Sequence, residues 1–367
     1  MQATETEVLI IGGGPAGLAA ALALRKKGLD VIVADGQLPP IDKACGEGLM
    51  PDAVAALAAL GVHPCGKHFA GLRFFHENVV AEARFAQSLG MMRPGLAVRR
   101  TALHLAMVDA AHRAGVKLLW NTPATGLTDN GALIAGEPIR ARWLIGADGA
   151  QSLVRKWSGL DRLACDRQRF AFRAHYEIRP WSEFVEVYWA DHFQVYIAPV
   201  DDDQILVALL CQDSAMRVAD AVQHFPQLAQ RLRGVGYASQ ERGAISARHK
   251  YWAVTQGNVA LVGDAAGTVD AITGEGLGLA FHQALALADC IAQGNLEPYE
   301  LAHRRIVRKT AFMDRILTLM DGRPQLQQRV IGALARNPCV FAGLLQFHVG
   351  RRSLPAPHGQ VAPQYEN

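Results

Sequence analysis

The sequence has few cysteines, and none of them falls into a pattern that would give it a structural role. The six cysteines are scattered, without a C-x-x-C pair and without matching histidine spacing. Such scatter argues against a structural zinc site and against a disulfide framework, and it is typical of proteins that fold in a reducing compartment. We therefore predict no metal site and a cytoplasmic location.

Strong charge, a long apolar run and a basic leader are also missing. A formal net charge of +3 on 367 residues is too slight to indicate a nucleic-acid partner. No uninterrupted apolar run reaches the length of a membrane-spanning helix, and residues 1–7 carry acids where a secretory signal would be basic. Apolar residues make up 50% of the chain, which allows a sizeable core in one elaborate domain or two.

What is present begins with a G-x-G-x-x-G motif between a predicted strand and a predicted helix. The apolar run 8–11 leads directly into Gly12, Gly14 and Gly17, and an Ala/Leu-rich helix is expected to follow. A second apolar strand ends in Asp35, where a dinucleotide-binding fold needs an acid for the ribose 2′-OH. This order predicts a Rossmann-type unit that binds a dinucleotide.

Each glycine of the motif has a physical task. Gly12 permits the tight turn that leaves the strand, because it can adopt positive φ. Gly14 lets a pyrophosphate approach the backbone, and Gly17 lets the helix pack closely on the sheet. The start of the following helix, which is expected over residues 18–27, presents free N–H groups and a positive dipole end to the phosphates. An acid at Asp35 favours FAD or NAD over NADP at this site.

The rest of the chain indicates a discontinuous nucleotide-binding part. A helix is expected after Asp52, a good N-cap residue. Predicted strands between 168 and 211 alternate apolar with polar residues, as in an antiparallel sheet with one wet face. We assign 1–70, 96–155 and 253–295 to an FAD-binding domain, 71–95 and 156–252 to a substrate-binding β-sheet domain, 296–354 to C-terminal helices and 355–367 to a tail.

Three further motifs carry a resemblance to a known family: Asp148-Gly149, Gly263-Asp264 and an R-x-x-L helix start at Arg100. With the opening glycines, the sequence resembles the FAD superfamily of p-hydroxybenzoate hydroxylase, flavin-dependent halogenases and geranylgeranyl reductases. The resemblance implies an α/β (α+β) fold: a Rossmann-type FAD-binding domain, an inserted antiparallel β-sheet substrate domain and a helical C-terminus, as in p-hydroxybenzoate hydroxylase.

The resemblance is closest to the geranylgeranyl-reductase-like branch, whose segments are similar to 45–49 and 274–277 here. That branch includes reductases of isoprenoid double bonds and monooxygenases. The hydroxylase pattern has Pro at the place of Ala271 and Asn at the place of Gly278, and the tryptophan-halogenase motif is absent. The residues that the resemblance assigns to FAD are Gly12, Gly14, Pro15, Ala16, Gly17, Asp35, Gly46, Arg100, Asp148, Gly149, Gly263, Asp264, Gly274, Gly276 and Leu277.

Three residues are candidates for catalysis. Cys45 lies in the loop after the second strand, which is expected beside the flavin ring; it is either an active-site thiol or a small buried residue. Glu47 in the same loop is either a proton donor or a helix-capping partner. Glu275 is expected to be oriented by the glycines beside it, with a catalytic role as the alternative.

A basic segment near 304–315 alternates with apolar residues at helical spacing. We favour a solvated face opposite an apolar face, and a membrane-surface helix suited to lipidic substrates is the alternative.

The leading functional interpretation is an NAD(P)H-dependent monooxygenase that hydroxylates an aromatic or polyketide-like small molecule through a flavin C4a-hydroperoxide. One alternative is a reductase that delivers hydride from flavin to isoprenoid, geranylgeranyl-type double bonds, with Cys45 as the candidate proton donor. A further alternative is a flavin-binding protein without turnover. The expected cofactor is FAD in all three cases, with NAD(P)H as the electron donor of the enzymes.

Overall fold

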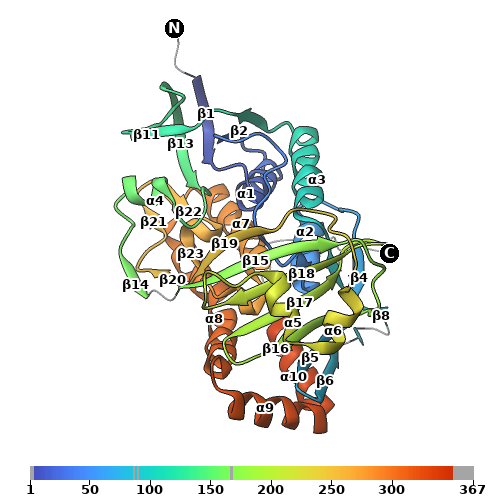
Figure 1. Ribbon diagram of the computed structural model, residues 1–367. Coiled ribbons are helices and arrows are strands. Elements are labelled where there is room, and N and C mark those ends of the chain that lie inside the picture. The colour runs from blue at the N-terminus through green and yellow to red at the C-terminus, as the bar shows by residue number, and fades with distance from the viewer. Residues whose placement is uncertain (1–3, 86, 89–90, 166–167, 350–367) are drawn as a thin grey trace, which may run out of the picture.

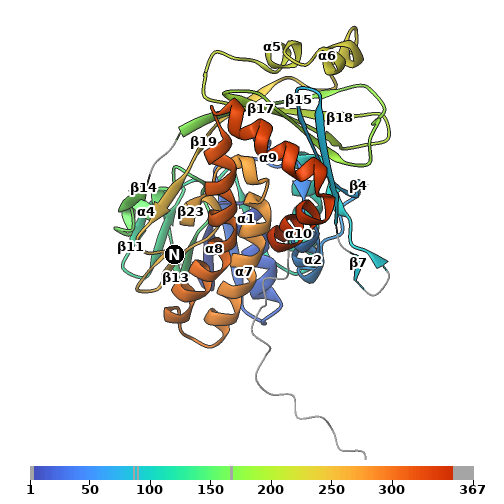
Figure 2. The same cartoon turned by 90° about the horizontal axis from the view of Figure 1, so that it is seen from below.

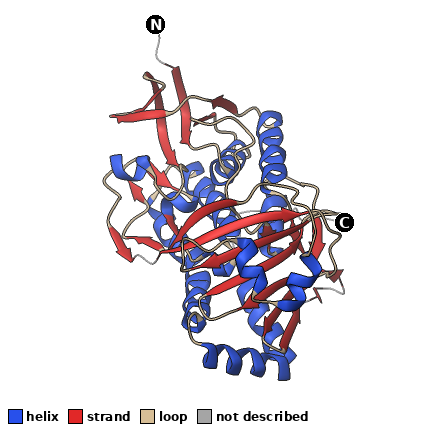
Figure 3. Cartoon of the chain, viewed as in Figure 1, coloured by secondary structure: helices blue, strands red, loops and turns tan. Residues whose placement is uncertain are grey.

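The computed structural model describes residues 4–85, 87–88, 91–165 and 168–349. Two β-sheets and a group of C-terminal helices form its main layers (Figure 1). In the secondary-structure view, helices lie between the two sheets and along the lower edge of the molecule (Figure 3).

The first sheet is the Rossmann-type sheet that the opening motif predicts. In the described residues its order is β10-β2-β1-β13-β12-β11, and β22 pairs with β13 and β21. β10, β2, β1, β13 and β22 run parallel, and Val8 lies opposite both Val31 and Trp143. Its strands are β1 (Thr4–Ile11), β2 (Val31–Asp35), β10 (Lys117–Trp120), β11 (Ala124–Thr128), β12 (Gly131–Ile134), β13 (Glu137–Gly146), β21 (Thr255–Gln256) and β22 (Val259–Leu261).

Helix α1 is the centre of the helical layer beside this sheet. It contacts both α3 and α7. Ala19, Ala20 and Ala21 are fully buried, and such small side chains let helix backbones approach closely. The helices of this part are α1 (Pro15–Arg25), α2 (Pro51–Ala59), α3 (Arg100–Arg113), α4 (Leu153–Trp157) and α7 (Gly276–Ala292).

The second sheet has the order β19-β15-β18-β17-β16-β5-β6 in the described part of the chain. All its pairs are antiparallel except β16 with β5. Its strands are β5 (Gly71–His76), β6 (Val79–Arg84), β15 (Gln168–Tyr176), β16 (Val185–Trp189), β17 (Phe193–Pro199), β18 (Ile205–Cys211) and β19 (Arg242–Ala247).

Both faces of this sheet are covered, and every residue of β16 and β18 is buried, so the expectation of one wet face is wrong. Along β17, Val195 and Ile197 join a core with α5 (Val218–Gln223) and α6 (Pro226–Leu232). Ala198, on the opposite face, joins a core with the C-terminal helices. The period of two along a strand therefore separates two apolar layers, one of which faces the functional site described below.

The C-terminal helices are α8 (Glu297–Met320), α9 (Pro324–Arg336) and α10 (Pro338–Val349). They lie on the side of the molecule that faces the viewer in Figure 2. Among the described residues, no single helix is long and apolar enough to cross a membrane. Helices α9 and α10, which are bent by 104° at their junction, meet the length and composition required only as a pair.

Short elements connect these layers. They are β3 (Gly48–Leu49), β4 (Lys67–Phe69), β7 (Gln87–Ser88), β8 (Met91–Met92), β9 (Gly95–Ala97), β14 (Leu163–Cys165), β20 (His249–Tyr251), β23 (Gly267–Thr268) and the 3₁₀ helices η1 (Gly263–Ala266) and η2 (Ala271–Thr273).

The predicted fold class is confirmed, and the domain boundaries stay predictions. The expectation that Asp52 caps a helix is wrong. Helix α2 begins at Pro51, with Met50 as its N-cap, because the fixed φ of proline suits the first helical position. Asp52 lies in the first turn, and its carboxylate is 3.4 Å from Nε2 of His282. The predicted tail, 355–367, lies outside the described residues.

One buried histidine makes the stability of this fold depend on pH. Burial lowers the pKa of His303 on α8 to about 4, whereas an unfolded histidine titrates near 6.5. Between these values the unfolded chain binds the proton and the folded chain does not, so stability falls as the pH drops from 6.5 to 4. Between pH 6.5 and pH 4, we expect the free energy of unfolding of His303→Gln to fall by roughly 1–3 kcal/mol less than that of the wild type.

The measurement is the free energy of unfolding at pH 7 and at pH 4.5 for both proteins. His63→Gln, at an exposed histidine, is the control and should leave the pH dependence as in the wild type. An unchanged pH dependence in His303→Gln would contradict the assignment.

Candidate functional site

A large cavity joins the two parts of the fold. Its volume is about 840 Å³. One end is formed by the glycine loops of the Rossmann-type sheet, and the other lies between the antiparallel sheet and the C-terminal helices. The cavity therefore has a backbone-rich, polar end and an apolar end.

The opening glycines build a turn that no other residue can replace without moving backbone. Gly12 has φ +111°, and a Cβ there would collide with the carbonyl group of Ala147. A Cβ on Gly17 would collide with the carbonyl oxygen of Gly12. Gly14 is different, because a Cβ there would meet nothing within 4 Å. Gly14 is the N-cap of α1 and lines the cavity with Pro15 and Ala16, so the start of α1 is open to a phosphate group.

Asp35 and His104 fix the glycine loop through hydrogen bonds to the backbone of Gly13. The Asp35 carboxylate accepts the N–H of Gly13 at 2.6 Å and the N–H of Gln37 at 2.8 Å. Asp35 lies at the end of β2 and does not line the cavity itself. Its predicted contact with ribose stays a prediction.

His104 was not a candidate from the sequence, although it follows Arg100 by one helical turn. Its Nε2 donates to the carbonyl oxygen of Gly13 at 2.8 Å, and its Nδ1 accepts the N–H of Ile41 at 3.4 Å. Burial lowers the pKa of His104. The neutral imidazole, protonated on Nε2, is therefore the form that supports the loop.

Arg100 and Asp264 form the charged part of the cavity wall. Asp264 is exposed to the cavity, where the enclosing walls raise its pKa and Arg100, Lys43 and His249 oppose that shift. Gly263 has φ +61° and donates its N–H to Oε1 of Gln283 on α7 at 2.7 Å. The loop that carries Asp264 is thus fixed to α7.

Asp148 and Gly149 line the same end of the cavity. Oδ2 of Asp148 accepts the N–H groups of Leu153 and Val154 at 2.7 and 3.1 Å, so it caps the first turn of α4. Oδ1 of Asp148 is buried and has no hydrogen-bond partner within the described structure. The motif residue therefore has one structural oxygen and one that is available to a ligand.

The loop before α2 places two of the catalytic candidates side by side. Oε1 of Glu47 accepts the N–H of Arg100 at 2.9 Å, and Oε2 lies 2.7 Å from Nε2 of His175 on β15. Glu47 is almost fully buried and has φ +55°. It thus caps α3 and ties the FAD-binding side to the antiparallel sheet, which agrees with the capping alternative, although the helix it caps lies outside its own loop.

Cys45 lies at the cavity wall, and its sulfur accepts the N–H of Glu47 at 3.3 Å. Burial raises the pKa of the Cys45 thiol, Arg100 lowers it and Glu47 adds to the rise. The thiol therefore stays protonated at neutral pH. Gly46 also lines the cavity, and a Cβ there would meet nothing within 4 Å.

Glu275 is held by side chains and not only by its neighbouring glycines. It is the N-cap residue of α7. Its carboxylate accepts the hydroxyl of Thr310 at 3.1 Å and lies 3.1 Å from Nε2 of His348. His348 also contacts the carbonyl oxygen of Thr273 at 3.2 Å. Glu275 therefore connects α7 to α8 and α10 at the cavity wall.

The glycines on either side of Glu275 are shaped for close approach. Gly274 has φ +65°, and a Cβ on Gly276 would meet nothing within 4 Å. Gly274, Gly276 and Leu277 all line the cavity. Free N–H groups at the start of α7 can stabilise negative charge placed there.

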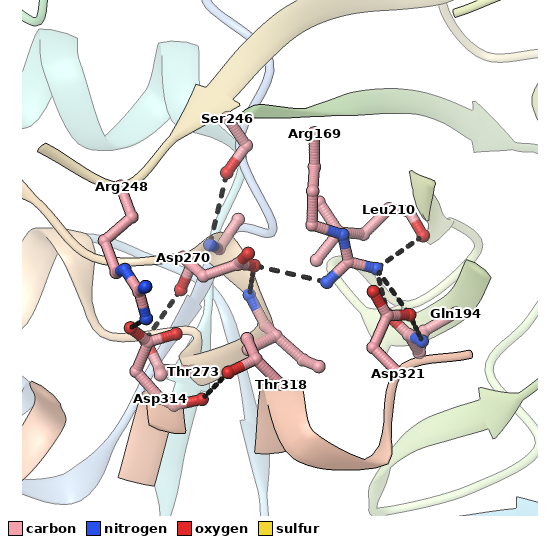
Figure 4. A network of polar contacts seen from close by, with 12 residues as sticks. Arg169, Gln194, Leu210, Ser246, Arg248, Asp270, Thr273, Asp314, Thr318 and Asp321 are labelled. Carbon is pink, nitrogen blue, oxygen red and sulfur yellow. Dashed lines mark hydrogen bonds and ion pairs between the residues drawn. The ribbon is translucent and has the colours of Figure 1, made fainter. Parts of the chain in front are cut away.

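A buried network of charged groups fixes the loop before these glycines (Figure 4). Arg169 on β15 is fully buried and donates to Asp270 at 3.4 Å and to Gln194 at 2.6 Å. It also lies 3.5 Å from Asp321, which follows α8. Asp270 in turn caps η2 by accepting the N–H of Ile272 at 3.0 Å.

No motif in the sequence indicates this network, because its members come from β15, β17, the loop before η2 and the end of α8. Tyr196 strengthens the same connection by donating its hydroxyl to the carbonyl oxygen of Ile272 at 3.2 Å. The loop beside the predicted flavin ring is therefore attached to the substrate-side sheet at two points.

These residues fit an FAD molecule. The N-terminus of α1 offers an open approach to phosphates at Gly14, and Arg100 supplies a cation whose Nε is buried and has no partner within the described residues. Among the residues that the structure describes, no group of three or more His, Cys, Asp or Glu is placed to hold a metal ion.

The contrast between Gly14 and the other glycines gives a test. Gly14→Ala should leave the melting temperature of the FAD-free protein unchanged, because the added methyl group meets no protein atom and φ is −70°. It should weaken FAD binding about tenfold, because the methyl group occupies the phosphate approach.

Fluorescence titration with FAD measures the affinity. Gly126→Ala, in β11 and away from the cavity, is the matched control and should bind FAD as the wild type does. Wild-type affinity in Gly14→Ala would contradict the placement of the phosphates.

Comparison with known proteins agrees with this geometry. The chain matches the FAD binding domain family over residues 5–294. A menaquinone reductase from Mycolicibacterium smegmatis is 28% identical over 337 residues, which cover 82% of this chain and 79% of that protein. Digeranylgeranylglycerophospholipid reductase 1 from Methanothermobacter thermautotrophicus is 33% identical over 171 residues, 43% of this chain and 42% of that one.

Among solved structures, p-nitrophenol 4-monooxygenase from Pseudomonas putida superposes with a TM-score of 0.81 at 20% identity. The match covers 96% of this chain and all (100%) of that one, and at this identity it shows the shared fold. The resemblance predicted from the sequence motifs is confirmed. The chain belongs to the FAD binding domain family and is an FAD-dependent oxidoreductase.

Proposed function

We propose that the protein is a reductase that adds two hydrogen atoms across a carbon–carbon double bond in the isoprenoid chain of a lipidic substrate. The observation that carries this proposal is the apolar end of the cavity, which continues directly from the glycine loops. The names of the two sequence relatives support it, because both are reductases and their substrates carry isoprenoid chains. The alternative interpretation of the sequence is therefore favoured over the leading one.

The apolar lining of this end suits a hydrocarbon chain better than a small polar ring. Most of the side chains that line it are apolar and come from the antiparallel sheet, from β4 and from the C-terminal helices, and Arg173 on β15 and His348 on α10 also line the cavity. The apolar side chains include Phe69, Phe74, Trp189, Leu210, Met320 and Phe341. All six are buried, so a prenyl chain bound here would be removed from water on all sides.

Cys45 and Arg100 lie at the other end of the cavity, beside the glycine loops. When bound, FAD supplies a hydride to one carbon of the double bond. The adjacent carbon then requires a proton. Cys45 holds one on its sulfur, because burial raises the pKa of its thiol. Transfer breaks the S–H bond and forms a C–H bond, and the thiolate regains its proton from water.

The neighbours of Cys45 fix where that proton is offered. Glu47 donates its backbone N–H to the sulfur, and its own carboxylate is held by Arg100 and His175. The loop is therefore rigid at the point where the thiol meets the cavity. We propose NAD(P)H as the source of the electrons.

The monooxygenase interpretation has weaker support. The structural match to a monooxygenase is at 20% identity and carries the fold alone. The departures at Ala271 and Gly278 from the hydroxylase pattern also separate this chain from those enzymes.

The proposal is tested by turnover without oxygen. With NADPH or NADH and a quinone that carries a prenyl side chain, the wild-type protein should form the product with one saturated isoprene unit under anaerobic conditions. Turnover that requires O₂ and yields a hydroxylated product would establish the monooxygenase instead. FAD binding without reduction by either nucleotide, with any substrate, would contradict both enzymes.

A variant that fills part of the cavity tests, in the same assay, whether the substrate binds at the apolar end. Ala208 on β18 lines the cavity, and Ala208→Phe should lower turnover of the prenyl substrate at least about tenfold while FAD content stays normal. Ala58→Phe adds the same group at an exposed position of α2 and should retain full turnover.

A second prediction concerns the proton donor. Cys45→Ala should lower kcat about 100-fold with little change in KM, because the hydride acceptor then lacks a positioned acid. Reduction of the bound FAD by NAD(P)H should keep its wild-type rate, since the thiol takes no part in that step.

Stopped-flow absorbance and steady-state kinetics give the two rates. Cys65→Ala, at an exposed cysteine, is the matched control. Wild-type kcat in Cys45→Ala would show that Cys45 is only a packing residue.

A further inference from the structure

The outer face of α8 carries an unusual stripe of exposed residues. Three large apolar side chains and three arginines follow one another at intervals of four and three residues, which places them on one helical face. The stripe consists of Leu301, Arg305, Arg308, Phe312, Arg315 and Leu319. The three apolar members are each more than half exposed, and the stripe contains no acidic residue.

Helix α10 presents a second apolar stripe with the same spacing. Val340, Leu344 and Phe347 are 56%, 40% and 45% exposed. The rings of Phe312 and Phe347 meet edge to face at 6.2 Å, and Lys309 lies 5.5 Å from the Phe347 ring. The two stripes therefore meet, and we refer to the residues of both stripes together with Lys309 as the α8/α10 face. Both helices lie toward the viewer in Figure 2.

Within the part of the chain that the structure describes, no carboxylate neutralises the cations of this face. Within the described residues, no ion pair involves Arg305, Arg308, Lys309 or Arg315, and the one acidic residue of the helix between 301 and 320, Asp314, is buried. Soluble proteins seldom leave large apolar side chains in such a continuous patch without a partner. The charge and the exposed rings both require a partner that is apolar and negatively charged.

The cavity lies directly behind this face. The inner sides of α8 and α10 form part of its apolar wall through Met313, Leu317 and Leu345. Leu344 both lines the cavity and is exposed on the α8/α10 face. A hydrocarbon chain at this face would therefore need to pass only Leu344 and its neighbours to enter the cavity.

We propose that the α8/α10 face docks on an anionic phospholipid bilayer. Phe312, Phe347 and the leucines enter the interface between head groups and acyl chains, and the arginines contact the lipid phosphates. The combination of exposed Phe and Leu side chains with several arginines on one helix is typical of helices that lie in a membrane interface, and it favours a bilayer over a protein partner. The proposal rests on exposed side chains and stands apart from the reaction proposed above.

Vesicle flotation with the full-length, FAD-loaded protein tests the docking. Wild-type protein should float with vesicles of one part phosphatidylglycerol to three parts phosphatidylcholine, and much less with pure phosphatidylcholine. Phe312→Ser/Phe347→Ser and Arg305→Gln/Arg308→Gln should each lower the bound fraction, the first about tenfold, while FAD content and melting temperature stay normal. High salt should weaken the wild-type interaction.

Matched controls lie on α3, away from this face. Leu105→Ser removes an exposed leucine and Arg113→Gln an exposed arginine, and both should float as the wild type does. The proposal is overturned if the wild-type protein stays with neither vesicle, or if both double variants float normally. Either result would leave anaerobic reduction of a detergent-dispersed prenyl substrate unaffected, so failure of docking and failure of the proposed reaction are distinguishable.

Discussion

The structure depends on a close approach of backbone to backbone at the start of α1. Gly17 packs on the carbonyl oxygen of Gly12, and Gly12 packs on the carbonyl group of Ala147, so that α1 rests directly on β1 and β13. Gly263 makes a similar contact with Ala16 from a third part of the chain. Because no Cβ fits at these glycines, the three segments can meet, and the open edge at the N-terminus of α1 remains for the phosphates. Every other part of the site is positioned relative to this junction.

A second constraint joins that junction to the substrate side. Arg169, Asp270 and Asp321 are buried together (Figure 4). Glu47 contacts His175 on the same sheet. Burying charged groups costs solvation free energy, so such pairs contribute more to a unique arrangement than to stability. Here they connect the loop beside the predicted flavin ring to the sheet that lines the apolar end, and the cavity keeps one shape across the boundary between the two parts.

Much of the FAD-binding side could be predicted, because its signals are local in sequence. The glycines around Gly14 and the acid Asp35 follow from one strand, one turn and one helix, and the short runs rich in β-branched and aromatic residues between 168 and 211 indicate the antiparallel sheet. The contacts that complete the site could not be predicted. Arg169 and Asp270 are separated by 101 residues and Glu47 and His175 by 128, and no spacing rule connects side chains so far apart. The position of Glu47 as a cap of α3 became evident only in three dimensions.

In the proposed reaction, a double bond gains hydrogen in an apolar cavity that continues from the flavin cradle. Mass spectrometry of the product formed in the presence of ¹⁸O₂, from a quinone with a prenyl side chain and NAD(P)H, tests this claim most directly. For a reductase we expect a product that has gained two hydrogen atoms and contains no ¹⁸O. A product that has gained one atom of ¹⁸O would contradict this reaction and would assign the cavity to oxygen chemistry.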